Sequence, residues 1–78
     1  MSVTKGVRLQ YLRAWREWRG ISQEELKGLS GVTAATISRI ENGAPARFET
    51  IGKLSTALQI TREQLLHSEP GKEKHGAA

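Results

Sequence analysis

The sequence predicts an all-α protein in which five short helices form one compact domain. Three observations favour this class. Apolar residues recur at helical spacing, residues typical of helix starts and stops divide the chain into short segments, and no segment alternates as a strand does. The 78 residues suffice for one small domain, and they contain no internal repeat.

The first helix is expected from about Val7 to Arg19, because Leu, Trp and Tyr recur there at helical spacing and Gly20 ends the run. Ser22 opens a second segment, SQEELKGL. Glu25 follows Ser22 by three residues, which is the capping-box pattern. Two helices with a short connection are therefore predicted in this part of the chain.

Thr33 is the expected N-cap of a third helix, AATISRIEN, which Gly43 should terminate. Pro45 disfavours helical backbone at Ala44, so a loop is expected there. A fourth helix, FETIGKLSTAL, and a short last one capped by Thr61, TREQLLH, complete the set.

These elements predict a domain over residues 7–68. Residues 1–6 are expected to be a flexible N-terminal arm. Pro70 and Gly71 should end regular structure, so that residues 69–78 form a disordered polar tail.

The charge balance is moderately basic, with 12 Lys and Arg against 8 acidic residues and a formal net charge of +4. Such a balance suits a surface that meets polyanions, and it also fits an ordinary soluble domain. The absence of cysteine excludes disulfides and Cys-based metal sites. Since neither a signal peptide nor a membrane-spanning apolar run is evident, we expect a cytoplasmic protein.

The segment Gln23–Asn42 has the pattern of two short helices joined by a tight turn at Gly31, which tolerates left-handed backbone. Leu26 on the first helix, with Ile37 and Ile40 on the second, can form the wedge that fixes their crossing. This arrangement is a helix-turn-helix, whose second helix is held in position to enter the major groove of DNA.

The run from Leu12 to Leu66 resembles the phage-repressor/Cro-type (XRE-like) helix-turn-helix family of DNA-binding regulators. The matching segments, in the family's order, are LRAWREWRGISQEEL, SGVTAATISRIENG, PARFETIGKLSTAL and REQLL. The resemblance implies a prokaryotic or phage protein that associates with the nucleoid when bound to double-stranded DNA. The chain departs from the family at Lys27, where a small residue is usual, and at Gln59, where Gly is usual. These departures concern stability and helix angles.

Helical periodicity places Ile37 and Ile40 on the buried side of the second motif helix. The opposite side should face the DNA groove. This gives five candidates for contacts with base edges: Ala34, Ala35, Thr36, Ser38 and Arg39.

The chemistry of these candidates differs. Arg39 suits a bidentate contact with guanine O6 and N7, with a phosphate contact or a surface ion pair to Glu as alternatives. Ser38 and Thr36 can bond either bases or phosphates. Ala34 and Ala35 can pack on thymine methyl groups and let the helix sit deep, or they are simply good helix formers.

Phosphate contacts should supply most of the affinity. The resemblance implies that Gln23 clamps a phosphate and can also touch a base. It likewise implies that Asn42 and Arg47 make flanking contacts, although Arg47 can alternatively enter a narrow minor groove. The Thr33 hydroxyl and the free N–H groups beside it offer a further phosphate site.

The resemblance also implies a partly buried ion pair between Arg16 and Glu41, which joins the first and third helices. Arg16 can reach a phosphate with its spare donors. Trp15 matches a core position of the family. Trp18 either covers the end of the first helix near Ile21 or belongs to a protein-contact patch.

One such domain covers a half-site that is too short for useful specificity, so a homodimer on palindromic DNA is expected, with half-sites about 34 Å apart. Leu65 and Leu66 cannot both be fully buried in so small a monomer unless the end of the last helix is covered. The candidate surface for a dimer or another protein partner consists of Trp18, Phe48, Leu65 and Leu66.

An enzyme is not indicated. His67 and His75 lack neighbouring ligands at metal spacing, and neither a nucleophile–base set nor a phosphate-cradling loop is present. We therefore expect no catalytic residue, metal, cofactor, small-molecule substrate or membrane partner. Two hypotheses remain: a sequence-specific transcriptional regulator, most simply a repressor with helix 33–42 in the major groove, or an antitoxin or adapter that uses the fold to bind proteins.

Overall fold

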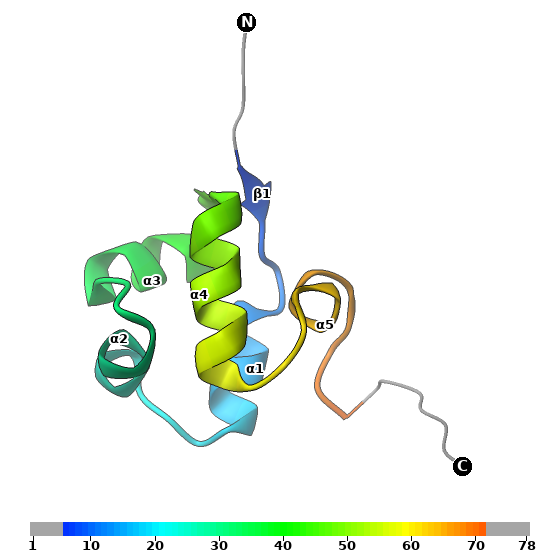
Figure 1. The fold of residues 1–78 in the computed structure, drawn as a ribbon, viewed down its shortest axis with the longest axis horizontal. Helices are drawn as coiled ribbons and strands as arrows, with labels where there is room; N and C mark the ends of the chain where they lie inside the picture. Colours follow the sequence, from blue (N-terminus) through cyan, green and yellow to red (C-terminus); the bar gives the residue numbers. More distant parts are fainter. Residues whose placement is uncertain (1–5, 72–78) are drawn as a thin grey trace, which may run out of the picture.

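The computed structural model describes residues 6–71, and these contain five helices and one short β-ribbon (Figure 1). Residues 1–5 and 72–78, which include most of the predicted arm and tail, lie outside the described residues. The predicted all-α class and helix order are confirmed. The elements are β1 (Val7–Arg8), α1 (Leu12–Trp18), α2 (Gln23–Ser30), α3 (Ala34–Glu41), β2 (Pro45–Ala46), α4 (Phe48–Leu58) and α5 (Arg62–His67).

The prediction that the first helix begins at Val7 is wrong. Val7 and Arg8 form β1, which pairs antiparallel with β2 in the register Val7 to Ala46 and Arg8 to Pro45. Helix α1 starts only at Leu12. Strands of two residues are too short to produce a detectable alternation, and their pairing depends on a segment far along the chain, so sequence periodicity did not reveal them.

The predicted helix starts are confirmed by their caps. The Ser22 hydroxyl accepts a hydrogen bond from the Glu25 N–H, and the Glu25 carboxylate accepts one from the Ser22 N–H, which makes a complete capping box at α2. Thr33 and Thr61 accept the equivalent backbone hydrogen bonds at the starts of α3 and α5. Each cap of this kind stabilises its helix by about 1 kcal/mol.

Helix α4 lies at the centre of the molecule, between α2 and α3 on one side and α1 and α5 on the other (Figure 1). Its apolar stripe packs into the core, and the predicted core position of Trp15 is confirmed by a side chain that is 3% exposed. The Trp15 indole N–H donates to the carbonyl of Ser68, 2.8 Å away, so its polar atom is also satisfied. The buried apolar residues are Leu9, Leu12, Trp15, Leu26, Val32, Ile37, Ile40, Ala46, Ile51, Leu54, Leu58 and Leu65.

The end of α4 is held by a contact that the sequence did not indicate. Gln59, where the family usually has Gly, adopts a left-handed backbone with φ of 62°. Arg19, which follows α1, donates from Nε to the carbonyl of Leu58 at 2.7 Å and from Nη2 to that of Gln59 at 3.2 Å. A guanidinium at a helix C-terminus is favourable, because the last carbonyls lack partners within the helix.

Within residues 6–71, no helix is both long and apolar enough to cross a membrane. The same part of the chain holds no group of three or more His, Cys, Asp or Glu side chains placed to bind a metal ion.

Candidate nucleic-acid interface

Helices α2 and α3 form the helix-turn-helix that the sequence predicted. Gly31 ends α2 with a left-handed backbone, φ 80°, so that the chain can turn sharply toward α3. The predicted wedge is confirmed, because Leu26 and Ile37 are fully buried and Ile40 is 2% exposed. Their burial fixes α3 against α2 and turns its other side outward.

The outward side of α3 carries the five residues predicted to face bases. Ala35 and Arg39 are exposed, whereas Ala34, Thr36 and Ser38 are half-buried. Helix α3 lies at the edge of the molecule, on the side away from α5 (Figure 1). A long, flat partner can therefore approach this side of α3 without meeting α5.

Arg39 forms no ion pair with any residue in the described range 6–71. Within these residues, Arg39 therefore does not form the surface ion pair with Glu that was one of its predicted alternatives. Its guanidinium, in the last turn of α3, has no ion-pair partner within residues 6–71 and can donate to an external acceptor.

The start of α3 has its own polar contacts. The Thr33 hydroxyl accepts the Thr36 N–H at 3.2 Å and donates to the Thr36 hydroxyl at 2.9 Å. Thr33 must therefore give up its bond to Thr36 before its hydroxyl can donate to a phosphate. The arrangement fixes both side chains over the first turn of the helix.

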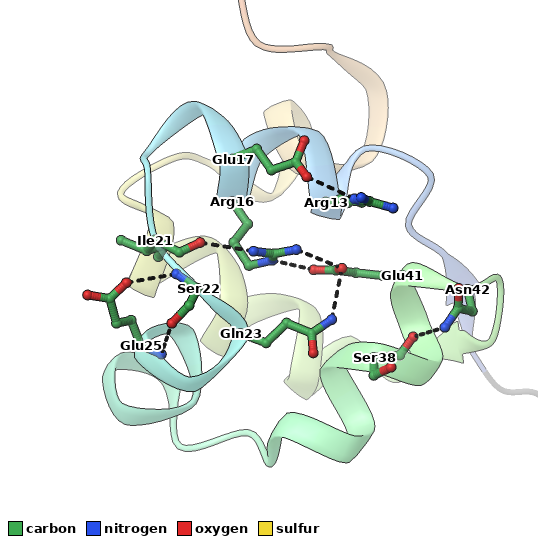
Figure 2. A network of polar contacts seen from close by, with 10 residues as sticks. All are labelled: Arg13, Arg16, Glu17, Ile21, Ser22, Gln23, Glu25, Ser38, Glu41 and Asn42. Atoms are coloured by element: carbon green, nitrogen blue, oxygen red, sulfur yellow. Dashed lines mark hydrogen bonds and ion pairs between the residues drawn. The ribbon is translucent and has the colours of Figure 1, made fainter.

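Arg16 and Glu41 form the ion pair that the family resemblance implied (Figure 2). The Arg16 Nε lies 2.6 Å from Glu41 Oε2 and Nη2 lies 3.0 Å from Oε1, while Nη1 donates to the carbonyl of Ile21 at 2.9 Å. Both side chains are largely removed from water, at 12% and 5% exposure. The hydrogen bond to Glu41 raises the pKa of Arg16 against the opposing effect of burial. These three bonds use three of the five guanidinium N–H donors, so one N–H on each terminal nitrogen remains for the predicted phosphate contact.

Gln23 joins this ion pair and completes a three-residue network. Its Nε2 donates to Glu41 Oε1 at 3.1 Å, so Glu41 on α3 binds side chains from α1 and α2 together (Figure 2). Gln23 is the first residue of α2 and is half-buried. Its amide is thus oriented by Glu41, while its carbonyl and one N–H remain for an external group.

Asn42 and Arg47 flank α3 on the loop that leads to α4. The Asn42 Nδ2 donates to the carbonyl of Ser38 at 2.9 Å, which anchors the exposed amide to the end of α3 (Figure 2). Arg47 is exposed and occupies the N-cap position of α4, and it forms no ion pair within residues 6–71. Two polar groups therefore border the outward side of α3 at its C-terminal end.

The hydrophobic residues proposed for a dimer or partner surface differ in exposure. The prediction that Leu65 lies on this surface is wrong, since Leu65 points from α5 into the core and is fully buried. Leu66 is half-buried, as expected if only one of the two leucines can pack inward. Phe48 and Trp18 remain largely exposed, at 67% and 59%.

Phe48 has a neighbour that the sequence did not suggest. The Arg62 guanidinium lies 5.3 Å from the centre of the Phe48 ring, a cation–π contact between α5 and α4. Arg62 crosses α4 at Gly52, where an added Cβ would lie 2.6 Å from Nη2. Spacing along the sequence gives no signal for a contact of this kind between two helices.

Comparison with known proteins places these features in a family. A model of the family described as "Helix-turn-helix" matches residues 12–65. The HTH-type transcriptional repressor RghR of Bacillus subtilis (strain 168) is 47% identical over 60 residues, which are 74% of this chain and 44% of that protein. The uncharacterized HTH-type transcriptional regulator RghRB of the same strain is 39% identical over 59 residues, 73% of this chain and 42% of that protein. The chain thus spans less than half the length of these two relatives.

A solved structure has the same fold. The P22 c2 repressor, crystallised in complex with a synthetic operator, matches with a TM-score of 0.69 and 29% identity. The match covers 83% of this chain and 100% of the other. The family match, the relatives and the shared fold together show that the chain belongs to the helix-turn-helix family of phage-repressor type.

Proposed function

We propose that this protein is a sequence-specific transcriptional regulator, acting as a repressor, that places α3 in the major groove of double-stranded DNA. The observation that carries the proposal is the outward side of α3, where Arg39 is exposed and has no ion-pair partner in the described chain. Two similar proteins support it, since one is named as a transcriptional repressor and the other is a repressor crystallised with a synthetic operator. Such a regulator acts in the cytoplasm of a prokaryote, on the nucleoid.

In this proposal Arg39 is the principal reader of bases, through a bidentate contact with guanine. Ala34 and Ala35 let the helix approach closely and pack on thymine methyl groups. Thr36 and Ser38, which are half-buried, add single hydrogen bonds to bases or phosphates. Specificity therefore rests on one strong contact and several weak ones.

The surrounding polar groups bind phosphates. Gln23 is suited to this role, because Glu41 orients its amide and one N–H remains free. Asn42 and Arg47 serve as the contacts on the other side of α3, and Thr33 contributes if its hydroxyl leaves Thr36. These bonds fix the depth and register of α3 without reading sequence themselves.

The chain acts as a homodimer on a palindromic operator, with half-sites about 34 Å apart. Phe48 and Leu66 are the exposed and half-buried apolar residues proposed for the contact between copies. A dimer doubles the number of bases read, which one small domain needs in order to select an operator.

The test is a selection of binding sequences from random duplexes, followed by titration of the wild type and Arg39→Ala. We expect a recovered palindrome and a loss of affinity of about 1–3 kcal/mol for Arg39→Ala on that sequence. Arg13→Ala is the matched control, because Arg13 is an exposed arginine on α1 that is paired with Glu17. Failure to enrich any sequence over random duplex overturns the proposal.

The second candidate is an antitoxin or adapter that uses this fold to bind a protein. The observation that favours it is the exposure of Trp18 and Phe48, two large apolar side chains on the surface. Such a module binds DNA with little dependence on sequence. The same selection therefore separates the two candidates, since only the regulator yields a palindrome.

A further inference from the structure

The β-ribbon brings the start of the chain to the loop that follows α3. Arg8 pairs with Pro45, and Val7 pairs with Ala46. Gly6 lies against the same strand so closely that an added Cβ would be 2.9 Å from the carbonyl oxygen of Ala46. Figure 1 shows β1 beside the start of α4, where this loop ends.

The Arg8 guanidinium lies over Gly43 in that loop. A Cβ built on Gly43 would be 3.8 Å from Nη2 of Arg8 and 3.9 Å from its Cζ and Nε. Gly43 directly follows Asn42, and Arg47 directly follows the paired residue Ala46. The fold therefore places Arg8 beside the loop that carries Asn42 and Arg47, two residues that we propose as phosphate contacts, although it lies far from them in the sequence.

Arg8 is exposed, and no residue of the described range 6–71 forms an ion pair with it. The ribbon fixes the direction of the Arg8 backbone, and the guanidinium of Arg8 has no anionic partner among residues 6–71. These are the properties of a side chain positioned for an external anion.

We propose that Arg8 binds a backbone phosphate of the duplex that α3 enters, beside the phosphates bound by Asn42 and Arg47. The inference rests on the proposed function. It adds a contact from β1, so that β1 and the loop from Asn42 to Arg47 bind the same stretch of DNA backbone. Since the contact is to phosphate, it strengthens binding to every sequence and does not select among them.

The test uses the full chain with three variants, Arg8→Ala, Arg8→Lys and Arg13→Ala, titrated over a range of salt concentrations on the selected duplex and on an unrelated duplex. For Arg8→Ala we expect a severalfold loss of affinity on both duplexes and a salt slope that is smaller by about one unit. Arg8→Lys should keep the slope, because a lysine supplies the same charge to a phosphate. Arg13→Ala removes the same charge from α1 and should change neither quantity.

An unchanged salt slope for Arg8→Ala, with wild-type binding intact, overturns the inference and leaves the proposed function standing. Loss of affinity on the selected duplex alone also overturns it, because Arg8 would then read bases or groove shape. Wild-type binding without sequence preference overturns the proposed function, while the slopes of the Arg8 variants still decide the phosphate contact. Thermal unfolding of each variant shows whether the ribbon is intact. If Arg8→Ala unfolds, a fourth variant, Arg8→Gln, keeps a long polar side chain without the charge, and its salt slope should be smaller by about one unit.

Discussion

Glu41 accepts hydrogen bonds from Arg16 with both carboxylate oxygens, at 2.6 and 3.0 Å, and this pair is almost fully removed from water. The same carboxylate also orients Gln23. One buried anion thus ties α1 to the two helices of the DNA-binding motif. It links the stability of the fold to the placement of a proposed phosphate contact.

Removal of one partner of this pair should be strongly destabilising. Glu41→Ala leaves the Arg16 guanidinium buried without an anion, and we expect the free energy of unfolding to fall by about 3–5 kcal/mol. Urea unfolding followed by circular dichroism measures the change. Arg13→Ala, which breaks an exposed pair with Glu17, is the control and should cost less than about 1 kcal/mol. A comparable small loss for Glu41→Ala would mean that water reaches the pair freely.

Arg19→Ala should remove the side-chain cap from the end of α4. The two hydrogen bonds to the carbonyls of Leu58 and Gln59 are lost, and we expect a destabilisation of about 1–2 kcal/mol. Arg19→Lys keeps the positive charge and loses the paired geometry, so its stability should lie between those of the wild type and Arg19→Ala. Equal stability of Arg19→Ala and the wild type in urea would show that water replaces the cap without cost.

Gly28→Ala should stabilise the protein. Gly28 lies inside α2, and an added Cβ would meet nothing within 4 Å, so the gain in helix propensity of about 1 kcal/mol is not opposed by a clash. Gly31, three residues further on, has as much free space around it, but its φ is 80°. Because a residue with a Cβ is strained at this φ, Gly31→Ala should be destabilising. A higher melting temperature for the first variant and a lower one for the second is the expected pair of results. The opposite order would contradict the assigned end of α2.

The helix-turn-helix could be predicted from sequence because its signals are local. The Ser22–Glu25 capping box, the Thr33 cap and the left-handed turn at Gly31 each involve residues close in the chain. Helical periodicity then assigned the burial of Ile37 and Ile40. Caps and helical periodicity involve residues that are close in the sequence, so they can be predicted without knowledge of the tertiary structure.

The features that sequence did not predict depend on contacts between distant segments. Val7 was assigned to a helix because its pairing with Ala46 has no local signal. The Arg19 cap on α4 and the Arg62 contact with Phe48 likewise arise only when helices are packed. Leu65 was misplaced for the same reason, since two adjacent leucines do not reveal which of them faces the core.

Arg47→Ala should weaken binding to all DNA sequences to a similar extent. Arg47 is exposed at the N-cap of α4, outside α3, which we propose to enter the groove, so we expect its guanidinium to contact phosphate rather than base edges. We expect a salt slope smaller by about one unit and an unchanged sequence preference. Titrations of the selected duplex and an unrelated duplex, at low and high salt, measure both quantities.

Comparison with Arg39→Ala separates a phosphate contact from a base contact. Both variants remove one exposed arginine that has no ion-pair partner in the described chain, so their effects on net charge are equal. If Arg39 reads guanine, its loss lowers affinity mainly on the selected duplex, whereas the loss of Arg47 lowers it on both. If Arg47→Ala instead changes the preferred sequence, Arg47 enters a narrow minor groove and reads its shape. The division of the interface into one base-reading arginine and flanking phosphate contacts would then be wrong.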